Sequence, residues 1–134
     1  MLQQRTIGKS ISASGVGLHS GKKVNMTLRP ANENIGIVFR RVDLDPVQEI
    51  EAKAEFVTDT VLGTTITKNS ASVMTVEHLL AAFSGLGIDN VYVDLKGPEI
   101  PIMDGSCISF ILLIESAGIK EQDSTKKFLR IKKN

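Results

Sequence analysis

The stretch Thr75-Val76-Glu77-His78-Leu79-Leu80-Ala81-Ala82-Phe83 predicts the helix around which the rest of the chain is organised. Apolar side chains recur in it at the three- and four-residue spacing of a helical stripe, namely at Val76, Leu79, Leu80, Phe83 and Leu86. Thr75 is a residue type that caps helix N-termini, so we expect its hydroxyl to accept from an amide of the first turn. Gly85 and Gly87 are expected to end the helix in left-handed conformations.

This helix carries an acid and an imidazole side by side. At about 100° of rotation per residue, Glu77 lies about 100° and His78 about 160° from the centre of the apolar stripe. His78 is therefore expected to point away from whatever the helix packs against. The pair fits either a solvated histidine with a neighbouring acid or a metal ligand with a neighbouring general base. The spacing alone does not choose between these interpretations.

Extended segments are expected on both sides of this helix, because β-branched residues and apolar-polar alternation recur there. They cover residues 6–14, 24–28, 35–40, 47–54, 61–67, 91–95 and 126–132. Segments 24–28 and 35–40 are separated by Pro30 and a short turn, and we expect them to pair as a β-hairpin.

A second helix is expected over residues 109–117, ended by Gly118. Its residues Phe110 to Ile114 are all apolar and cover every side of the helical cylinder. A helix on the outside of one sheet needs a single apolar stripe, whereas a helix that is apolar all round is normally buried on both sides. We therefore expect a further layer to cover the second side of this helix, the side toward which His78 would also point.

Composition excludes several classes of protein. The 134 residues, 42% of them apolar, suffice for one domain with its own core. The formal net charge of +1 gives no electrostatic case for a nucleic-acid partner. Cys107 is the only cysteine, which excludes an internal disulfide and suits a reducing compartment, and we interpret it as a packing residue. No apolar run is long enough for a signal peptide or a transmembrane segment, so we expect a soluble, cytoplasmic protein.

Metal donors are scarce in this sequence. His19 and His78 are the only histidines, whereas catalytic zinc generally takes three protein ligands. A zinc site made by this chain alone is therefore not expected. His19 lies in a loop rich in glycine, where an exposed histidine without a special role is the default interpretation.

Several segments, in this order, resemble the N-terminal domain of one enzyme family, the UDP-3-O-acyl-N-acetylglucosamine deacetylases of lipid A biosynthesis. They are Gln4-Arg5-Thr6, Gly15 to Gly21, Val38-Phe39-Arg40-Arg41, Asp43-Leu44-Asp45-Pro46, Thr75-Val76-Glu77-His78-Leu79, Gly85 to Asn90 and Pro98 to Ser106. The resemblance covers essentially the whole chain, and the motifs are jointly specific although each one is weak alone.

The resemblance implies an α+β fold, a two-layer sandwich of a mixed β-sheet with two helices on one face. It further implies that residues 1–134 are the N-terminal half of a two-domain β-α-α-β architecture, whose second domain is absent from this chain. That second domain would supply the layer expected above.

The same resemblance implies a zinc hydrolase that acts on an acylated UDP-sugar. His78 would be one zinc ligand and Glu77 the general base, while the remaining ligands would come from the second domain. Thr60 and Leu62, with Val61 between them, resemble the segment that lines the acetyl end of the substrate site, and His19 resembles a histidine near the cleft.

Two functions remain open for the chain itself. One is half of a zinc-dependent deacetylase; the other is a non-catalytic, truncated domain that folds and self-associates as a homodimer. Two histidines are too few for the full catalytic set of the family, which favours the second function for the chain alone and the first for the protein it comes from.

Overall fold

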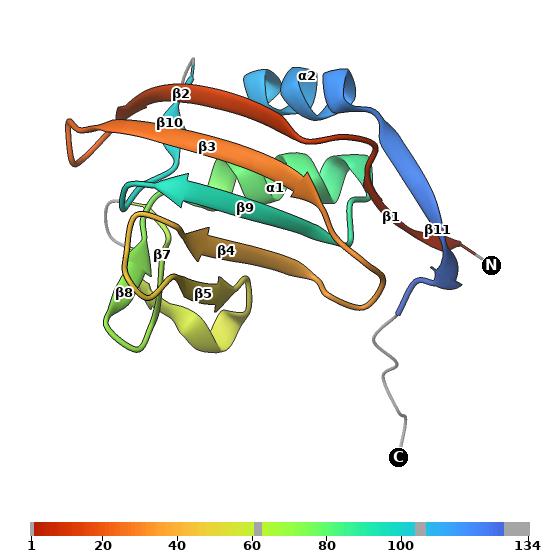
Figure 1. Cartoon of the computed structure of the whole chain (residues 1–134), viewed down its shortest axis with the longest axis horizontal. Helices are drawn as coiled ribbons and strands as arrows, with labels where there is room; N and C mark the ends of the chain where they lie inside the picture. Colours follow the sequence, from red (N-terminus) through yellow and green to blue (C-terminus); the bar gives the residue numbers. More distant parts are fainter. Residues whose placement is uncertain (1, 61–62, 104–106, 128–134) are drawn as a thin grey trace.

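The computed structural model describes residues 2–60, 63–103 and 107–127 (Figure 1). Its helices are α1 (Glu77–Leu86) and α2 (Ile108–Ala117), with a short 3-10 turn η1 (Ala54–Phe56). Its strands are β1 (Gln3–Ile7), β2 (Ile11–Gly17), β3 (Lys23–Pro30), β4 (Ile37–Arg41), β5 (Gln48–Glu51), β6 (Val57–Asp59), β7 (Thr65–Lys68), β8 (Ala71–Val73), β9 (Val91–Lys96), β10 (Pro101–Ile102) and β11 (Ile119–Thr125).

The main layer is a six-stranded mixed sheet in the order β10-β2-β3-β9-β4-β5, in which only the β4 and β9 pair is parallel. Helix α1 lies behind this sheet in Figure 1, and α2 lies beside α1 along the β2 edge. The α+β sandwich with two helices on one face is therefore confirmed. Two smaller sheets flank it, the ribbon β1-β11 and the three-stranded sheet β6-β7-β8.

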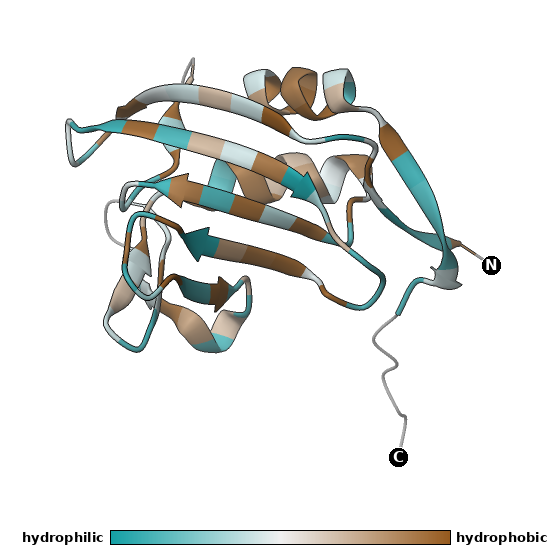
Figure 2. Ribbon diagram, in the orientation of Figure 1, coloured by the Kyte–Doolittle hydropathy of each residue, from teal (hydrophilic) through white to brown (hydrophobic). Residues whose placement is uncertain are grey.

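The core lies between the sheet and the helices, because the two central strands alternate strictly. The inward side chains of β3 and β9 are all fully buried: Val24, Met26, Leu28, Val91, Val93 and Leu95. Figure 2 shows the same alternation as teal and brown bands along both strands. From the helices, Leu79 and Phe83 of α1 and Ile114 of α2 close the core with 0% exposure.

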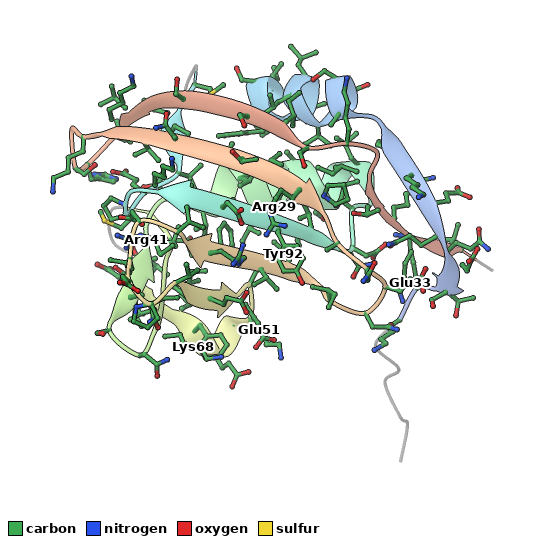
Figure 3. All side chains as sticks on the ribbon, viewed as in Figure 1. Arg29, Glu33, Arg41, Glu51, Lys68 and Tyr92 are labelled. Carbon is green, nitrogen blue, oxygen red and sulfur yellow. The ribbon has the colours of Figure 1, made fainter. Side chains whose placement is uncertain are left out.

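The opposite face of the sheet is polar. Arg29 donates to Asp94 at 2.7 Å, and its guanidinium carbon lies 4.8 Å from the ring centroid of Tyr92. Figure 3 shows Arg29 and Tyr92 together on this face. The three-stranded sheet β6-β7-β8 is joined to the main sheet by Arg41 of β4, whose Nη1 donates to the carbonyl of Ser72 in β8 at 2.9 Å.

Residues 6–14 do not form the single strand that their pattern predicts. β1 and β2 belong to different sheets and are separated at residues 8–10. Gly8 donates to the carbonyl of Gly118 at 2.9 Å, and a Cβ at Gly8 would lie 2.9 Å from the carbonyl oxygen of Ala117. The end of α2 therefore contacts the backbone at Gly8, between β1 and β2, and the extended segment is interrupted there.

The predicted hairpin of segments 24–28 and 35–40 is wrong. β3 pairs with β2 and β9, and β4 pairs with β9 and β5. Strand β9, fully buried on its inner face, takes the position between β3 and β4, since a central strand needs hydrogen-bonding partners at both edges.

Three other extended segments differ from the predictions. The last described strand, β11, ends at Thr125, before the predicted segment 126–132, of which residues 128–132 lie outside the described residues. Within the predicted segment 47–54 only Gln48–Glu51 is a strand, and Val61 and Leu62 of segment 61–67 also lie outside the described residues. Four strands were not predicted: β6, β8, β10 and β11. The first three have only two or three residues, too few to show an alternation, and β11 is polar after Ile119.

Both helices are confirmed, but the start of α1 differs from the expectation. Val76 occupies the N-cap position without a side-chain capping bond, and the hydroxyl of Thr75 instead donates to Glu99 Oε2 at 2.8 Å. Gly85 lies inside the helix, whereas Gly87, at φ 69°, ends it in the left-handed conformation as predicted.

Helix α2 ends as predicted at Ala117, before Gly118 with φ 83°. One side of it is buried, through Phe110, Ile114 and Ala117, while Leu112 is 62% exposed. The prediction that one sheet covers only one side of this helix is confirmed.

Candidate functional site

The Glu77 and His78 pair begins helix α1, where the phase of the apolar stripe decides how each side chain points. Leu79 and Phe83 fix the buried side of the helix, so Glu77 is half-buried and His78 is exposed, as the helical phase predicts. Glu77 Oε2 accepts a hydrogen bond from the backbone N–H of Thr64 at 2.9 Å. The N–H of Val76 donates to the carbonyl of Thr64 at 3.2 Å, so one residue holds both the helix start and the carboxylate.

A small cavity of about 90 Å³ opens beside this pair. Its walls are mainly apolar, and the polar groups among them come from the start of α1. The lining residues are Leu18, Thr75, Glu77, His78, Ile100, Pro101, Ile102, Met103 and Phe110. An apolar pocket with a few convergent polar groups is the usual form of a small-molecule site.

Thr75 also lines a second cavity, again of about 90 Å³. The other residues that line this second cavity are His19, Asp59, Gly63, Thr65 and Met74. Gly63 lines the second cavity and also lies close to Glu77. A Cβ built on Gly63 would lie 3.3 Å from Glu77 Oε1 and 3.7 Å from His19 Nε2. Its φ of 139° is a conformation that L side chains rarely adopt, so a glycine suits this position.

Glu99 is the central polar residue that sequence reasoning missed. Its side chain is completely buried. Its carboxylate accepts from the N–H of His19 at 3.0 Å, from the N–H of Ser20 at 2.9 Å and from the hydroxyl of Thr75 at 2.8 Å. Burial acts to raise the pKa of Glu99, but the amides of Ser20 and His19 and the Thr75 hydroxyl outweigh it, so the pKa is lowered below its ordinary value. The sequence offered only an acid between two prolines, which by itself does not indicate burial.

The structure brings together three of the five residues singled out from the sequence: His19, Glu77 and His78. Thr60 is exposed and lines neither of the two cavities. Leu62 lies outside the described residues. Cys107 is partly buried against the core, as its interpretation as a packing residue predicts.

The donors at the start of α1 fit part of a zinc site. An exposed imidazole next to a half-buried carboxylate offers the nitrogen and oxygen donors that zinc accepts. Among the described residues, no group of three or more His, Cys, Asp or Glu side chains is close enough to hold a metal ion. The described part of the chain thus offers donors that zinc accepts but not a complete set of ligands.

Comparison with known proteins identifies the family. The family model for UDP-3-O-acyl N-acetylglycosamine deacetylase matches residues 4–134. The chain belongs to this deacetylase family. The resemblance noted from the sequence motifs is therefore confirmed.

Curated deacetylases support the same assignment. The chain is 60% identical over 134 residues to the UDP-3-O-acyl-N-acetylglucosamine deacetylase of Xylella fastidiosa strain Temecula1. It is also 60% identical over 133 residues to the enzymes of the same name from Chromohalobacter salexigens and Legionella pneumophila strain Corby. It covers 99–100% of its own length in these matches but only 44% of theirs. No helix in the described ranges is long and apolar enough to cross a membrane.

Proposed function

We propose that this chain is the N-terminal half of a zinc-dependent deacetylase that hydrolyses the N-acetyl group of UDP-3-O-acyl-N-acetylglucosamine. The reaction would belong to lipid A biosynthesis in the cytoplasm of a Gram-negative bacterium. The observation that supports it most is the Glu77 and His78 pair at an apolar cavity, in a chain 60% identical to deacetylases of that name.

His78 would hold the metal in this proposal. Its imidazole is exposed at the cavity wall, and a ring nitrogen can serve as one of the ligands, with the remainder supplied by a second domain. Zinc, when bound, would polarise the acetamide carbonyl and make it a better electrophile.

Glu77 would be the general base. The N–H of Thr64 holds Oε2, which fixes the orientation of the carboxylate and leaves Oε1 to take a proton from the attacking water. Water adds to the carbonyl carbon as Glu77 takes one of its protons, and the carbon–nitrogen bond breaks as the leaving nitrogen takes up a proton, so that the products are acetate and a free amine. The apolar walls at Ile100, Ile102 and Phe110 would keep other water away from the reacting carbonyl.

The second candidate function is a non-catalytic domain that folds and self-associates. The observation that favours it is the exposed apolar side of α2, where Ile108 and Leu112 are 59% and 62% exposed. A second copy of the chain could cover these side chains in place of a second domain.

Two variants of the complete, two-domain protein test the proposed enzyme. His78→Ala should lose most of the bound zinc, because a ligand is removed. Glu77→Ala should keep the zinc yet lower kcat by about a hundredfold or more, the usual scale for a lost general base. Zinc content is measured by mass spectrometry and kcat by release of acetate.

The exposed residue Glu55 provides the control, since Glu55→Ala makes the same truncation on the surface turn η1. It should leave zinc content and kcat unchanged. Full activity in Glu77→Ala, or full zinc content in His78→Ala, would contradict the proposed roles.

A further inference from the structure

We propose that Glu99 is a positioning residue for this site. Its buried carboxylate joins the loop that carries His19 to the residue that precedes α1, and in doing so it holds Glu77 in place for proton transfer. The inference rests on the proposed function, because it assigns Glu99 a role through the proposed base. Glu99 itself lines neither of the two cavities.

The contacts of Glu99 join two segments that are far apart in the sequence. His19 and Ser20 donate from the turn between β2 and β3, whereas Thr75 donates from the residue before the helix N-cap. The backbone fixes Glu99 beside the second segment, since Met74 donates to the carbonyl of Pro98 at 2.8 Å. Ile100 in turn donates to the carbonyl of Met74 at 3.1 Å.

Burial makes these contacts interdependent. A carboxylate with no solvent exposure is stable in the ionised form only when hydrogen bonds replace its hydration. Two amides and one hydroxyl provide these hydrogen bonds. A change at Glu99 therefore weakens hydrogen bonds on both segments at once.

The conformation of Thr75 indicates that the contact holds the helix start in place. Its φ is 61°, a left-handed value that is an outlier for a β-branched residue. Such a conformation persists only where the surrounding structure enforces it, and it is often found at functional sites. The Thr75 hydroxyl bonded to Glu99 is one restraint, and the Val76 bond to Thr64 is the next along the chain.

Gly17 shows that the loop is built around the same carboxylate. A Cβ at Gly17 would overlap Glu99 Oε1 and the hydroxyl of Ser20. Only glycine therefore allows the carboxylate to reach the amides of His19 and Ser20. Since Thr75 also lines both cavities, the Glu99 contacts lie directly behind the walls of the site.

The link from Glu99 to the base is short. Thr75 is two residues before Glu77, and α1 begins at Glu77 itself. Without the restraint, Thr75 can relax toward ordinary backbone angles, and the first turn of α1 shifts with it. A displacement of a catalytic group by about 1 Å can lower the rate by about a hundredfold.

The test measures kcat, KM and zinc content of the complete two-domain protein with Glu99→Gln, a change that keeps the shape but removes the charge. We expect kcat to fall by about tenfold to a hundredfold, with KM and zinc content close to those of the parent. Glu49→Gln makes the same change on an exposed acid of β5 and should have no effect. A kcat equal to that of the parent would overturn the inference.

Loss of stability alone must be separated from loss of positioning. Val91→Ala opens a cavity at the start of β9, at the opposite end of that strand from Glu99. It should lower the melting temperature but not the kcat of the folded protein. If Glu99→Gln lowers activity only as far as Val91→Ala does at matched folded fraction, Glu99 is structural and the inference fails.

A second pair of variants keeps the inference testable even if Glu99→Gln does not fold. Thr75→Ser keeps the hydroxyl, whereas Thr75→Val keeps the shape and loses it. We expect a loss of kcat like that of Glu99→Gln in the valine variant and a clearly smaller loss in the serine variant, because serine retains the hydroxyl that bonds to Glu99. In the double variant that combines Glu99→Gln with Thr75→Val, the two losses of kcat should not add, because both substitutions break the same hydrogen bond.

These results are distinguishable from failure of the proposed function. If Glu77→Ala is inactive while Glu99→Gln and Thr75→Val are as active as the parent, only the positioning role is wrong. If Glu77→Ala is fully active, the proposed base is wrong and with it the inference.

Discussion

Two acidic residues near the start of α1 are held in different surroundings. Glu77 is half-buried and accepts one backbone hydrogen bond, from Thr64. Glu99 is fully buried and accepts from two amides and a hydroxyl. Full burial with several donors suits a fixed charge, whereas partial exposure suits the role of general base proposed for Glu77. The two glutamates thus suit different roles through their surroundings alone.

The lowered pKa of Glu99 predicts a pH dependence of folding. Because the folded pKa lies below the ordinary value of 4.5, the unfolded chain binds more protons in the interval between the two values. The stabilising contribution of Glu99 is therefore fully present above about pH 4.5 and is lost as the pH falls through the folded pKa. At pH 7, Glu99→Gln should lower the free energy of unfolding by about 1–3 kcal/mol.

Urea unfolding of the 134-residue chain and its Glu99→Gln variant, at several pH values, measures this effect. The difference between the two proteins should shrink below pH 4.5. The difference in free energy of unfolding between the two proteins is compared, because Asp43 adds its own pH dependence to both. The pKa of Asp43 is also lowered, chiefly by its hydrogen bond from Arg41. A difference independent of pH would contradict the prediction.

At the scale of single elements, α2 presents two apolar sides with opposite surroundings. Phe110 is 3% exposed and packs in the core, while Leu112 is 62% exposed. The side chains are similar in hydrophobicity, so their contributions to folding of this chain differ through burial alone. The surplus apolar side contributes nothing until something covers it.

The two positions therefore predict opposite effects of truncation in the isolated chain. Phe110→Ala should lower the free energy of unfolding by about 3–5 kcal/mol, since it removes buried surface and leaves a cavity. Leu112→Ala should change it by less than about 0.5 kcal/mol under conditions in which the chain is monomeric. Chemical denaturation at low concentration compares the two, and a large loss in Leu112→Ala would show that the residue is covered.

At the scale of the whole molecule, the cavity beside Glu77 and His78 is bordered both by α2 and by exposed apolar side chains from other elements. Phe110 of α2 lines that cavity, and so do Leu18 and Ile102, which are 57% and 39% exposed. A layer that covered the exposed side of α2 together with Leu18 and Ile102 would also close over the start of α1. In the proposed enzyme this layer is the second domain, which would bring the missing zinc ligands to His78.

Without that domain, we expect the isolated chain to dimerise through α2. Analytical ultracentrifugation at micromolar concentration should show a dimer, because burial of the apolar patch on both copies stabilises the pair. Leu112→Glu should restore the monomer by placing a charge in the interface, and Glu55→Lys should not. A monomeric parent chain that binds no apolar dye would contradict the expectation.

We also expect zinc to bind the isolated chain weakly. One imidazole and a neighbouring carboxylate leave most of the coordination shell to water, whereas a tight site has three or four protein ligands. Equilibrium dialysis should give clearly substoichiometric zinc, and addition of the second domain should restore tight binding. Stoichiometric zinc in the unaided chain would contradict this expectation.

Much of this protein was determined by its sequence through short-range patterns. The helical phase placed His78 outward and Glu77 at the flank, and the apolar excess from Phe110 to Ile114 predicted an uncovered side of α2. Gly87 and Gly118 ended their helices as predicted, with φ of 69° and 83°. These features depend on periods of a few residues and on the conformational freedom of glycine, which a single segment carries by itself.

Tertiary structure alone decided the rest. The order of strands depends on which strand edges pair across the whole sheet. Because β9 lies between β3 and β4, these two strands do not form the expected hairpin. The hydroxyl of Thr75 was available to cap the helix locally, yet it bonds to Glu99, 24 residues away. A buried carboxylate needs hydrogen-bond donors, and the fold can bring these from any part of the chain. The amides of His19 and Ser20 that bond to Glu99 are far from it in the sequence, so the residues around Glu99 do not indicate them.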